Sequence, residues 1–318
     1  MASSAPLATT GLQTGCEHAW TDTGGGRLRQ CNACSLVATA RVPAFDYEDE
    51  YFTDPLSGGY DFAADFSVDF DTARFEGELD RLAAAGLRGT LLDVGCATGT
   101  YMAAAQRRGW TVTGVETAAF AREEAARRTG SLVTASCEAL PAGHRYDLVT
   151  LHHVLEHLHE PVAFLRDTLA PRVGRRLLIE VPHFDSLASR VYGSQWRDLR
   201  LEQHVCHYTG PTLSRLLTAA GFRVTRVYTL WQPLWSLRAN LELARLVAGG
   251  LRGADRRWET ADVVPGPSDE KSAYRRPAGG RRLLVRATAV LTRPVVSLLE
   301  RQGYGDRLVV EAEPGDRR

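Results

Sequence analysis

Short apolar runs alternate with amphipathic stretches through the middle of the chain. Runs typical of buried strands fall at 90–94, 111–116, 131–135, 146–151, 175–181 and 222–230. Segments with helical periodicity precede or separate most of them, at 72–85, 100–108, 118–128, 161–170 and 210–221. Repeated strand–helix units favour a mostly parallel sheet with helices on both faces. The pattern therefore predicts an α/β fold with its core over residues 89–230.

The flanks break this rhythm and divide the chain into further segments. Small, polar residues 1–15 predict a disordered tail, and residues 16–44 combine cysteines with a glycine turn. Residues 45–88 are rich in aromatic and acidic side chains and end in the expected lead-in helix. Residues 231–305 form a largely helical insertion, and residues 306–318 hold a terminal strand and a short tail.

The charge balance argues against a general nucleic-acid-binding protein. The 318 residues include 38 basic and 38 acidic side chains, so the formal net charge is zero. The first residues lack the charged and apolar regions of a signal peptide, and no apolar run approaches the ~18 residues of a membrane span. We therefore expect a cytoplasmic protein, in which the six cysteines are core residues or metal ligands rather than disulfides.

The segment LLDVGCATG, from Leu91 to Gly99, carries the most informative chemistry. A buried strand ends in Asp93 and passes through small residues into a helix N-terminus, where backbone N–H groups can approach a ligand. The glycines, Gly95 and Gly99, do not fit the G-x-G-x-x-G dinucleotide pattern, which disfavours an NAD-dependent dehydrogenase. The acid at the strand end suits a cationic ligand. Glu116 ends the next strand, where it either accepts hydrogen bonds from ribose hydroxyls, the interpretation we favour, or caps the following helix.

Five stretches together resemble the class I SAM-dependent methyltransferase family: LLDVGCATGTYM, VTGVETAAFA, RYDLVTLHHVLEHLHEP, LLIEVPHFDS and HYTGPTLSRLLTAAGF. The resemblance covers roughly residues 45–230 and the last strand. It implies S-adenosyl-L-methionine (SAM) as cofactor. It also implies an α/β, Rossmann-like, seven-stranded sheet in the order 3-2-1-4-5-7-6, with strand seven antiparallel.

The resemblance carries the family's cofactor contacts onto matching positions. The methionine end of SAM would lie against Asp93, Gly95, Cys96, Ala97 and Gly99. Glu116 would bind the ribose, Ser136 and Cys137 would flank the adenine, and His152 would touch the cofactor. This chain departs from the family at Ala97, where glycine is common, and at Ser136, where an acid is common.

The activity that the resemblance implies is methyl transfer to a small-molecule acceptor. We favour O-methylation in specialised, natural-product metabolism. The alternatives are C- or N-methylation of a small molecule or sugar, an RNA 2′-O-methyltransferase, and a non-catalytic SAM-binding interaction module. The aromatic part of residues 45–88 would fold over the cofactor as a lid, unless it only packs as a linker. Residues 231–305 would cap the acceptor, although their amphipathic helices also suit a membrane surface, a second subunit or core packing.

A histidine-rich segment follows the fourth strand of the core. His153, Glu156 and His157 have the i, i+3, i+4 spacing of one helix face, and His204 and His207 follow later in the chain. One interpretation is acid–base chemistry on an acceptor hydroxyl, with His153 or His204 as the base. A second is a divalent-cation site at His153, Glu156, His157 and one later histidine. It resembles the E-x-x-E-H pattern of metal-dependent O-methyltransferases, with a histidine in place of the first acid. The third is that Glu156 and His157 only brace the loop through hydrogen bonds.

The cysteines near the N-terminus have the pattern of a structural zinc site. Cys16-x-His18 is followed after twelve residues by Cys31-x-x-Cys34, which resembles a zinc-ribbon knuckle. The alternative is that these cysteines bind no metal. The remaining three, Cys96, Cys137 and Cys206, are interpreted as small apolar residues of the core.

Overall fold

The computed structural model describes residues 16, 19–42, 67–231, 294 and 296–315. The predicted lid at 45–66, most of the insertion at 231–305, and His18 lie outside the described residues. Among the described residues, no helix has the length and apolar character that crossing a membrane requires.

The larger of two sheets forms the centre of the described structure. Its strands are β4 (Thr90–Val94), β5 (Thr111–Val115), β6 (Val133–Thr134), β7 (Tyr146–His152), β8 (Val173–Pro182), β10 (Phe222–Leu230) and β11 (Arg307–Pro314). Their order is β6-β5-β4-β7-β8-β11-β10, and β11 runs antiparallel to both of its neighbours. Counted along the core this is 3-2-1-4-5-7-6, so the expected Rossmann-like sheet is confirmed.

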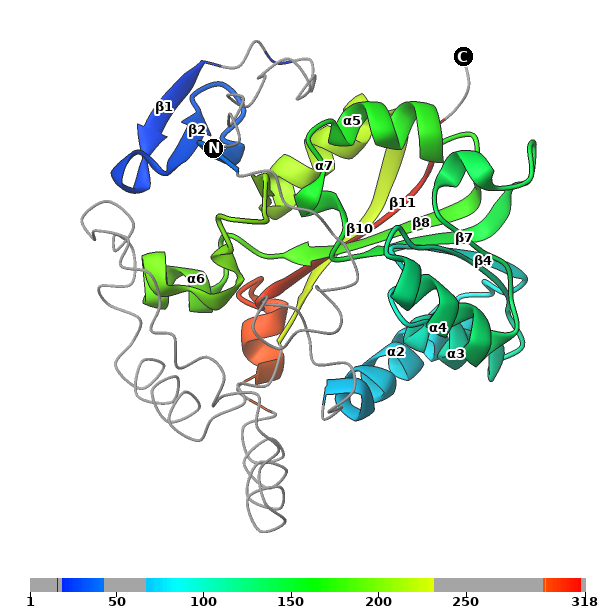
Figure 1. Ribbon diagram of the computed structural model, residues 1–318. Coiled ribbons are helices and arrows are strands. Elements are labelled where there is room, and N and C mark those ends of the chain that lie inside the picture. Colours follow the sequence, from blue (N-terminus) through cyan, green and yellow to red (C-terminus); the bar gives the residue numbers. More distant parts are fainter. Residues whose placement is uncertain (1–15, 17–18, 43–66, 232–293, 295, 316–318) are drawn as a thin grey trace.

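Helices cover both faces of this sheet (Figure 1). They are α2 (Ser67–Ala84), α3 (Thr100–Gln106), α4 (Ala119–Thr129), α5 (Pro161–Ala163), α6 (Leu187–Tyr192) and α7 (Gly210–Ala219). Helices α2, α3 and α4 lie on one face, and α5 and α7 on the other. Because both faces are covered, the central strands are mostly apolar; Leu92, Val149 and Leu177 are completely buried.

The expected elements agree with the structure except at two places. The helix expected at 161–170 is α5 followed directly by a π-helical turn, η5 (Phe164–Leu169). The histidine segment is not an α-helix: only Leu155–His157 is helical, as the 3-10 turn η4. His153 precedes this turn with a φ of +56°, so the expected single helix face of His153, Glu156 and His157 is wrong.

The second sheet joins the N-terminal segment to the core. Its strands are β1 (Trp20–Thr23), β2 (Leu28–Cys31), β3 (Val37–Thr39) and β9 (Cys206–His207), all antiparallel in this order. The 3-10 turn η2 (Gly24–Gly26) connects β1 to β2. The sequence pattern does not predict this sheet, because strands of two to four residues carry too little periodicity.

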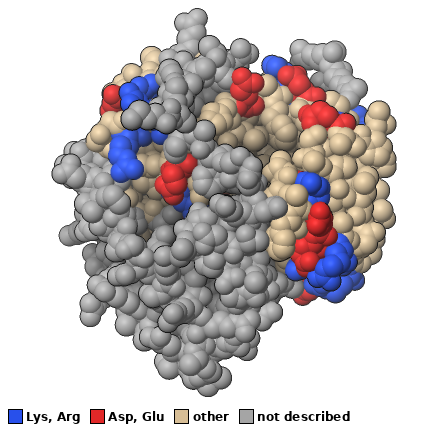
Figure 2. Space-filling model, viewed as in Figure 1, with Lys and Arg blue, Asp and Glu red and all other residues tan. Residues whose placement is uncertain are grey.

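Charged side chains on the described surface are mixed in sign. On the face in Figure 2, basic and acidic groups lie next to one another over the described residues. Many form ion pairs, such as Arg108 with Asp80 at 2.6 Å. Exposed pairs of this kind contribute little to stability, so they act mainly on solubility.

Candidate functional site

The loop between β4 and α3 has an unusual backbone. Gly95, Ala97 and Gly99 all have positive φ, at +72°, +47° and +79°. Glycine adopts this conformation at no steric cost, but alanine does not. A Cβ added to Gly95 would lie 2.4 Å from the Val154 side chain, which explains why glycine is needed there. Ala97 adopts the left-handed backbone conformation although it is not a glycine.

Two buried acids flank this loop at the carboxyl ends of adjacent parallel strands. Asp93 Oδ1 accepts a 2.8 Å hydrogen bond from the Thr150 hydroxyl. Glu116 accepts the Ala97 N–H at 2.9 Å and the Ala118 N–H at 3.0 Å, so it braces the loop and the residue that precedes α4. Burial raises the pKa of Glu116, although these backbone hydrogen bonds oppose the shift.

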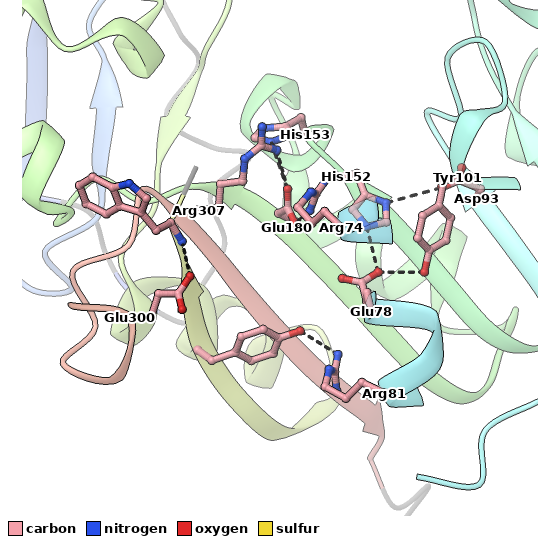
Figure 3. A network of polar contacts seen from close by, with 12 residues as sticks. Arg74, Glu78, Arg81, Asp93, Tyr101, His152, His153, Glu180, Glu300 and Arg307 are labelled. Carbon is pink, nitrogen blue, oxygen red and sulfur yellow. Dashed lines mark hydrogen bonds and ion pairs between the residues drawn. The ribbon is translucent and has the colours of Figure 1, made fainter. Parts of the chain in front are cut away.

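His152 lies between two carboxylates at the end of β7 (Figure 3). Its Nε2 is 3.3 Å from Glu78 on α2, and its Nδ1 is 3.9 Å from Asp93, too far for a hydrogen bond. The Tyr101 hydroxyl donates to Glu78 at 2.9 Å. Burial opposes a charged imidazole, yet Asp93 and Glu78 outweigh it and raise the pKa of His152 to about 10. At neutral pH two carboxylates therefore surround one imidazolium.

A second buried network joins His153 to Glu180 at the end of β8 (Figure 3). Arg307 donates to Glu180 at 2.7 Å and also contacts His153 Nε2, while Arg74 of α2 contacts Glu180 from the other side. His153 Nδ1 is 3.1 Å from Glu156. His153 Nε2 also lies 3.3 Å from Glu180, and although burial and Arg307 oppose it, Glu156 and Glu180 raise the pKa of His153. Both nitrogens are engaged, so His153 braces this network and is not poised as a base.

Among the described residues, Glu156, His157 and His204 form one of two compact His/Glu clusters near the end of β7; the other is Glu78, His152 and Glu180. One ligand atom from each lies within 4.8 Å of the others. His157 Nδ1 is 3.2 Å from Gln203 O, and His204 Nδ1 is 2.9 Å from Asp198 O. Carbonyls only accept, so both rings carry hydrogen on Nδ1 and a lone pair on Nε2.

Burial favours neutral histidine rings in this cluster, next to a Glu156 carboxyl group with one oxygen unpaired in the described part of the chain. Burial lowers the pKa of His157, and burial with nearby His157 and His207 lowers that of His204 well below its usual value. Glu156 is 1% exposed, and its Oε2 has no hydrogen-bond partner among the described residues. A buried carboxylate oxygen without a donor is costly, so its presence calls for an explanation.

Other predicted site residues lie apart from this cluster or serve packing. His207 points to the N-terminal sheet, where its Nε2 is 2.9 Å from the Thr39 hydroxyl. Cys96 and Cys137 are buried in hydrophobic clusters, and burial raises the pKa of Cys137 to about 11. Ser136 precedes the 3-10 turn η3 (Cys137–Ala139) at the end of β6.

Three N-terminal cysteines come together as the spacing predicts. The sulfurs of Cys16, Cys31 and Cys34 lie within 4.8 Å of one another, and the Cys16 and Cys31 sulfurs are 3.6 Å apart. A disulfide needs about 2.05 Å, whereas a tetrahedral zinc with ~2.3 Å bonds separates its sulfurs by about 3.8 Å. The Cys34 N–H also points to the Cys31 sulfur at 3.5 Å. This donor set fits zinc; the fourth predicted ligand, His18, lies outside the described residues.

The sequence reasoning missed several charged residues of the site. Glu180 ends β8 as Asp93 ends β4, and an acid at the carboxyl end of a core strand was the available signal. Arg74 and Glu78 are four residues apart on α2 and so share a face, but their partners come from distant strands. Nothing local distinguishes Arg307 from the other arginines of the chain.

A seven-stranded, mostly parallel sheet with acids at the ends of two adjacent strands beside a glycine loop is the arrangement of a Rossmann-like domain. Residues 70–227 match a family model described as a methyltransferase domain. The core of this chain therefore matches a methyltransferase domain, which is consistent with the class I SAM-dependent family that its motifs resemble.

Comparisons with other proteins add similarity at low identity. No curated protein matches this sequence. The plantazolicin methyltransferase BpumL, in complex with a pentazolic desmethylPZN analog and SAH, is 15% identical, covering 84% of this chain and 93% of that chain with a TM-score of 0.48. A SAM-dependent methyltransferase from Archaeoglobus fulgidus is 17% identical over 78% and 100%, with a TM-score of 0.44. The magnesium protoporphyrin IX methyltransferase from Synechocystis PCC 6803, with bound SAH, is 21% identical over 49% and 75%, with a TM-score of 0.41.

Proposed function

We propose that this protein is a SAM-dependent methyltransferase that methylates an oxygen atom of a small-molecule acceptor in specialised metabolism. The observation that carries the proposal is the placement of Asp93 and Glu116 at the ends of adjacent parallel strands, on either side of the left-handed loop. Carboxylates in these places suit a ligand with a cationic amino-acid end and a ribose. The match to a methyltransferase domain over 70–227 supports it.

The residues around His152 fit the charge of the cofactor. When bound, SAM supplies a methyl group on a sulfonium, which is transferred in line to an attacking atom. Asp93 and Glu78 lie on either side of His152, so acidic side chains would lie next to the cationic cofactor. Acidic groups attract a cationic cofactor more strongly than its neutral product, which would favour product release.

We further propose that Glu156, His157 and His204 bind a divalent cation next to the acceptor. The supporting observation is the buried Glu156 oxygen without a donor, facing two neutral rings whose Nδ1–H groups are held by carbonyls. Backbone carbonyls orient metal-binding histidines in this way. His153 takes no part as a ligand in this proposal, because Arg307 and Glu156 engage its nitrogens. A bound cation would lower the pKa of an acceptor hydroxyl.

The cysteines form the third part of the proposal. We propose that Cys16, Cys31 and Cys34 bind one structural zinc, with His18 as the fourth ligand. We also propose that the segment at 231–305 caps the acceptor.

Calorimetric titration with S-adenosylhomocysteine (SAH) tests the methyltransferase proposal. We expect stoichiometric binding by the full chain. A folded, metal-replete sample that does not bind SAH would refute it and favour an interaction module.

Titration with Co²⁺ or Mn²⁺ tests the cation site separately. Zinc at the cysteines would be counted first by metal analysis, with about one ion per chain expected. We expect further cation binding that is lost in Glu156→Gln and kept in the matched variant Glu160→Gln. Equal binding by both variants would mean that Glu156 is not a ligand.

A further inference from the structure

Residues 19–42, which we call the cysteine hairpin, contact the cluster of Glu156, His157 and His204 through the segment 204–207. Strand β3 pairs with β9 in the core, and just beyond this pair the Thr39 N–H donates to Val205 O at 2.9 Å. On the other side of the same segment, the Val205 N–H donates to Glu156 O at 2.7 Å. Residues 204–207 therefore lie between the N-terminal sheet and the turn η4 that carries Glu156.

The Thr39 side chain adds two contacts to this junction. Its Oγ1 donates to His204 O at 2.6 Å and lies 2.9 Å from His207 Nε2. A hydroxyl has one proton, and a carbonyl can only accept it. His207 Nε2 must therefore carry its own hydrogen and donate to Thr39. Burial lowers the pKa of His207 to about 3, so the ring is neutral and has one tautomer.

Water cannot replace these contacts, because the junction is buried. Thr39, His204 and His207 are 2%, 5% and 4% exposed. Apolar packing also continues across it: Cys31 and Leu36 of the hairpin belong to the same hydrophobic cluster as the core residues around η4. The hairpin is thus packed against the histidine segment and not tethered beside it.

We propose that Thr39 is a positioning residue for the histidine cluster, and that through it the cysteine hairpin sets the geometry of the Glu156, His157 and His204 site. Thr39 and His204 are 165 residues apart in the chain. The inference rests on the proposed function of that cluster. In this proposal Thr39 contacts neither the cofactor nor the acceptor. Its hydroxyl holds the His204 backbone in place and fixes the His207 tautomer.

The experiment compares imidazole ¹⁵N spectra of histidine-labelled full-length protein. Thr39→Val keeps the shape of the side chain and removes its hydroxyl. We expect the tautomer equilibrium of His207 to move about tenfold toward Nδ1–H, with a shift of the His204 signals, because one neutral buried hydrogen bond to each is lost. Thr39→Ser keeps the hydroxyl and should restore the wild-type spectrum.

The matched control is Thr21→Val in the same hairpin. The Thr21 hydroxyl donates to Asn32 at 3.0 Å on the exposed side, so its loss should leave the His204 and His207 signals unchanged. Wild-type signals in Thr39→Val would overturn the proposal, as would equal changes in Thr21→Val. Co²⁺ titration of each sample keeps the two proposals apart, because absent cation binding in the wild-type protein contradicts only the proposed function of the cluster.

Hydrogen exchange of the wild-type protein covers the case in which Thr39→Val does not fold. If the hairpin holds the histidine segment, the Thr39 and Val205 amides open together and exchange with protection that agrees within about threefold. Protection of Val205 that exceeds that of Thr39 by about 100-fold would show that the segment is held without the hairpin.

Discussion

Replacing Glu116 by glutamine separates its role in the fold from its proposed role in cofactor binding. A carboxylate offers about four lone-pair positions. The Ala97 and Ala118 amides and the Thr117 hydroxyl occupy three, which leaves about one for a ribose hydroxyl. Glutamine has only one acceptor oxygen. Its NH₂ group would therefore face another donor, which is either a backbone N–H or a ribose hydroxyl.

The pKa direction of Glu116 predicts the effect on stability. Because burial raises the pKa in the folded state, the charged form costs free energy above that pKa, and the cost disappears as the pH falls. Glutamine removes this cost but loses one charge-assisted hydrogen bond of about 1.5–3 kcal/mol. We expect the two effects to offset, so that the unfolding free energy at pH 7 changes by less than about 2 kcal/mol.

For cofactor binding, no gain offsets the loss of the hydrogen bond. The loss of one charge-assisted hydrogen bond to ribose predicts about 10- to 100-fold weaker SAH binding by calorimetry in Glu116→Gln. Urea unfolding of the same samples measures stability, and Glu123→Gln, an exposed change on α4, is the matched control. Wild-type SAH affinity in a stably folded Glu116→Gln protein would refute the ribose role and leave Glu116 as a brace of the loop.

Two further predictions concern the same end of the sheet. Ala97→Gly removes the strain of a left-handed alanine but increases the entropy of the unfolded chain. We expect the free energy of unfolding in urea to rise by about 0.5 kcal/mol; a decrease would mean that the loop is not strained. For His152, the pKa raised to about 10 stabilises the fold fully below its unfolded value of about 6.5, and this stabilisation is lost as the pH rises through about 10. Glu78→Gln should lower this pKa in an NMR titration and flatten the alkaline loss of stability; an unchanged pKa would assign the shift to Asp93 and Glu180.

The sequence by itself determined the sheet and the loop that binds the cofactor in our proposal. The apolar runs and their helical spacers fall where β4, β5, β7, β8 and α7 are found, because burial on both faces leaves a continuous local pattern. The small residues from Gly95 to Gly99 predicted a tight loop for the same local reason. The cysteine spacing likewise predicted that Cys16, Cys31 and Cys34 converge.

The tertiary structure alone decided which charged and histidine side chains lie together in each cluster. Spacing grouped His153 with Glu156 and His157, but the positive φ of His153 turns it toward Arg307 and Glu180. His204 joins the cluster because strand pairing places its segment against Glu156 O.

The pairing of β3 with β9, which places Thr39 beside His204, leaves no local sign. Two strands of two and three residues carry no periodicity, and their contact depends on closing a loop of more than 160 residues. Which distant partners meet is decided by the packing of the whole core, and so only the folded chain shows that the cysteine hairpin and the histidine cluster form one structure.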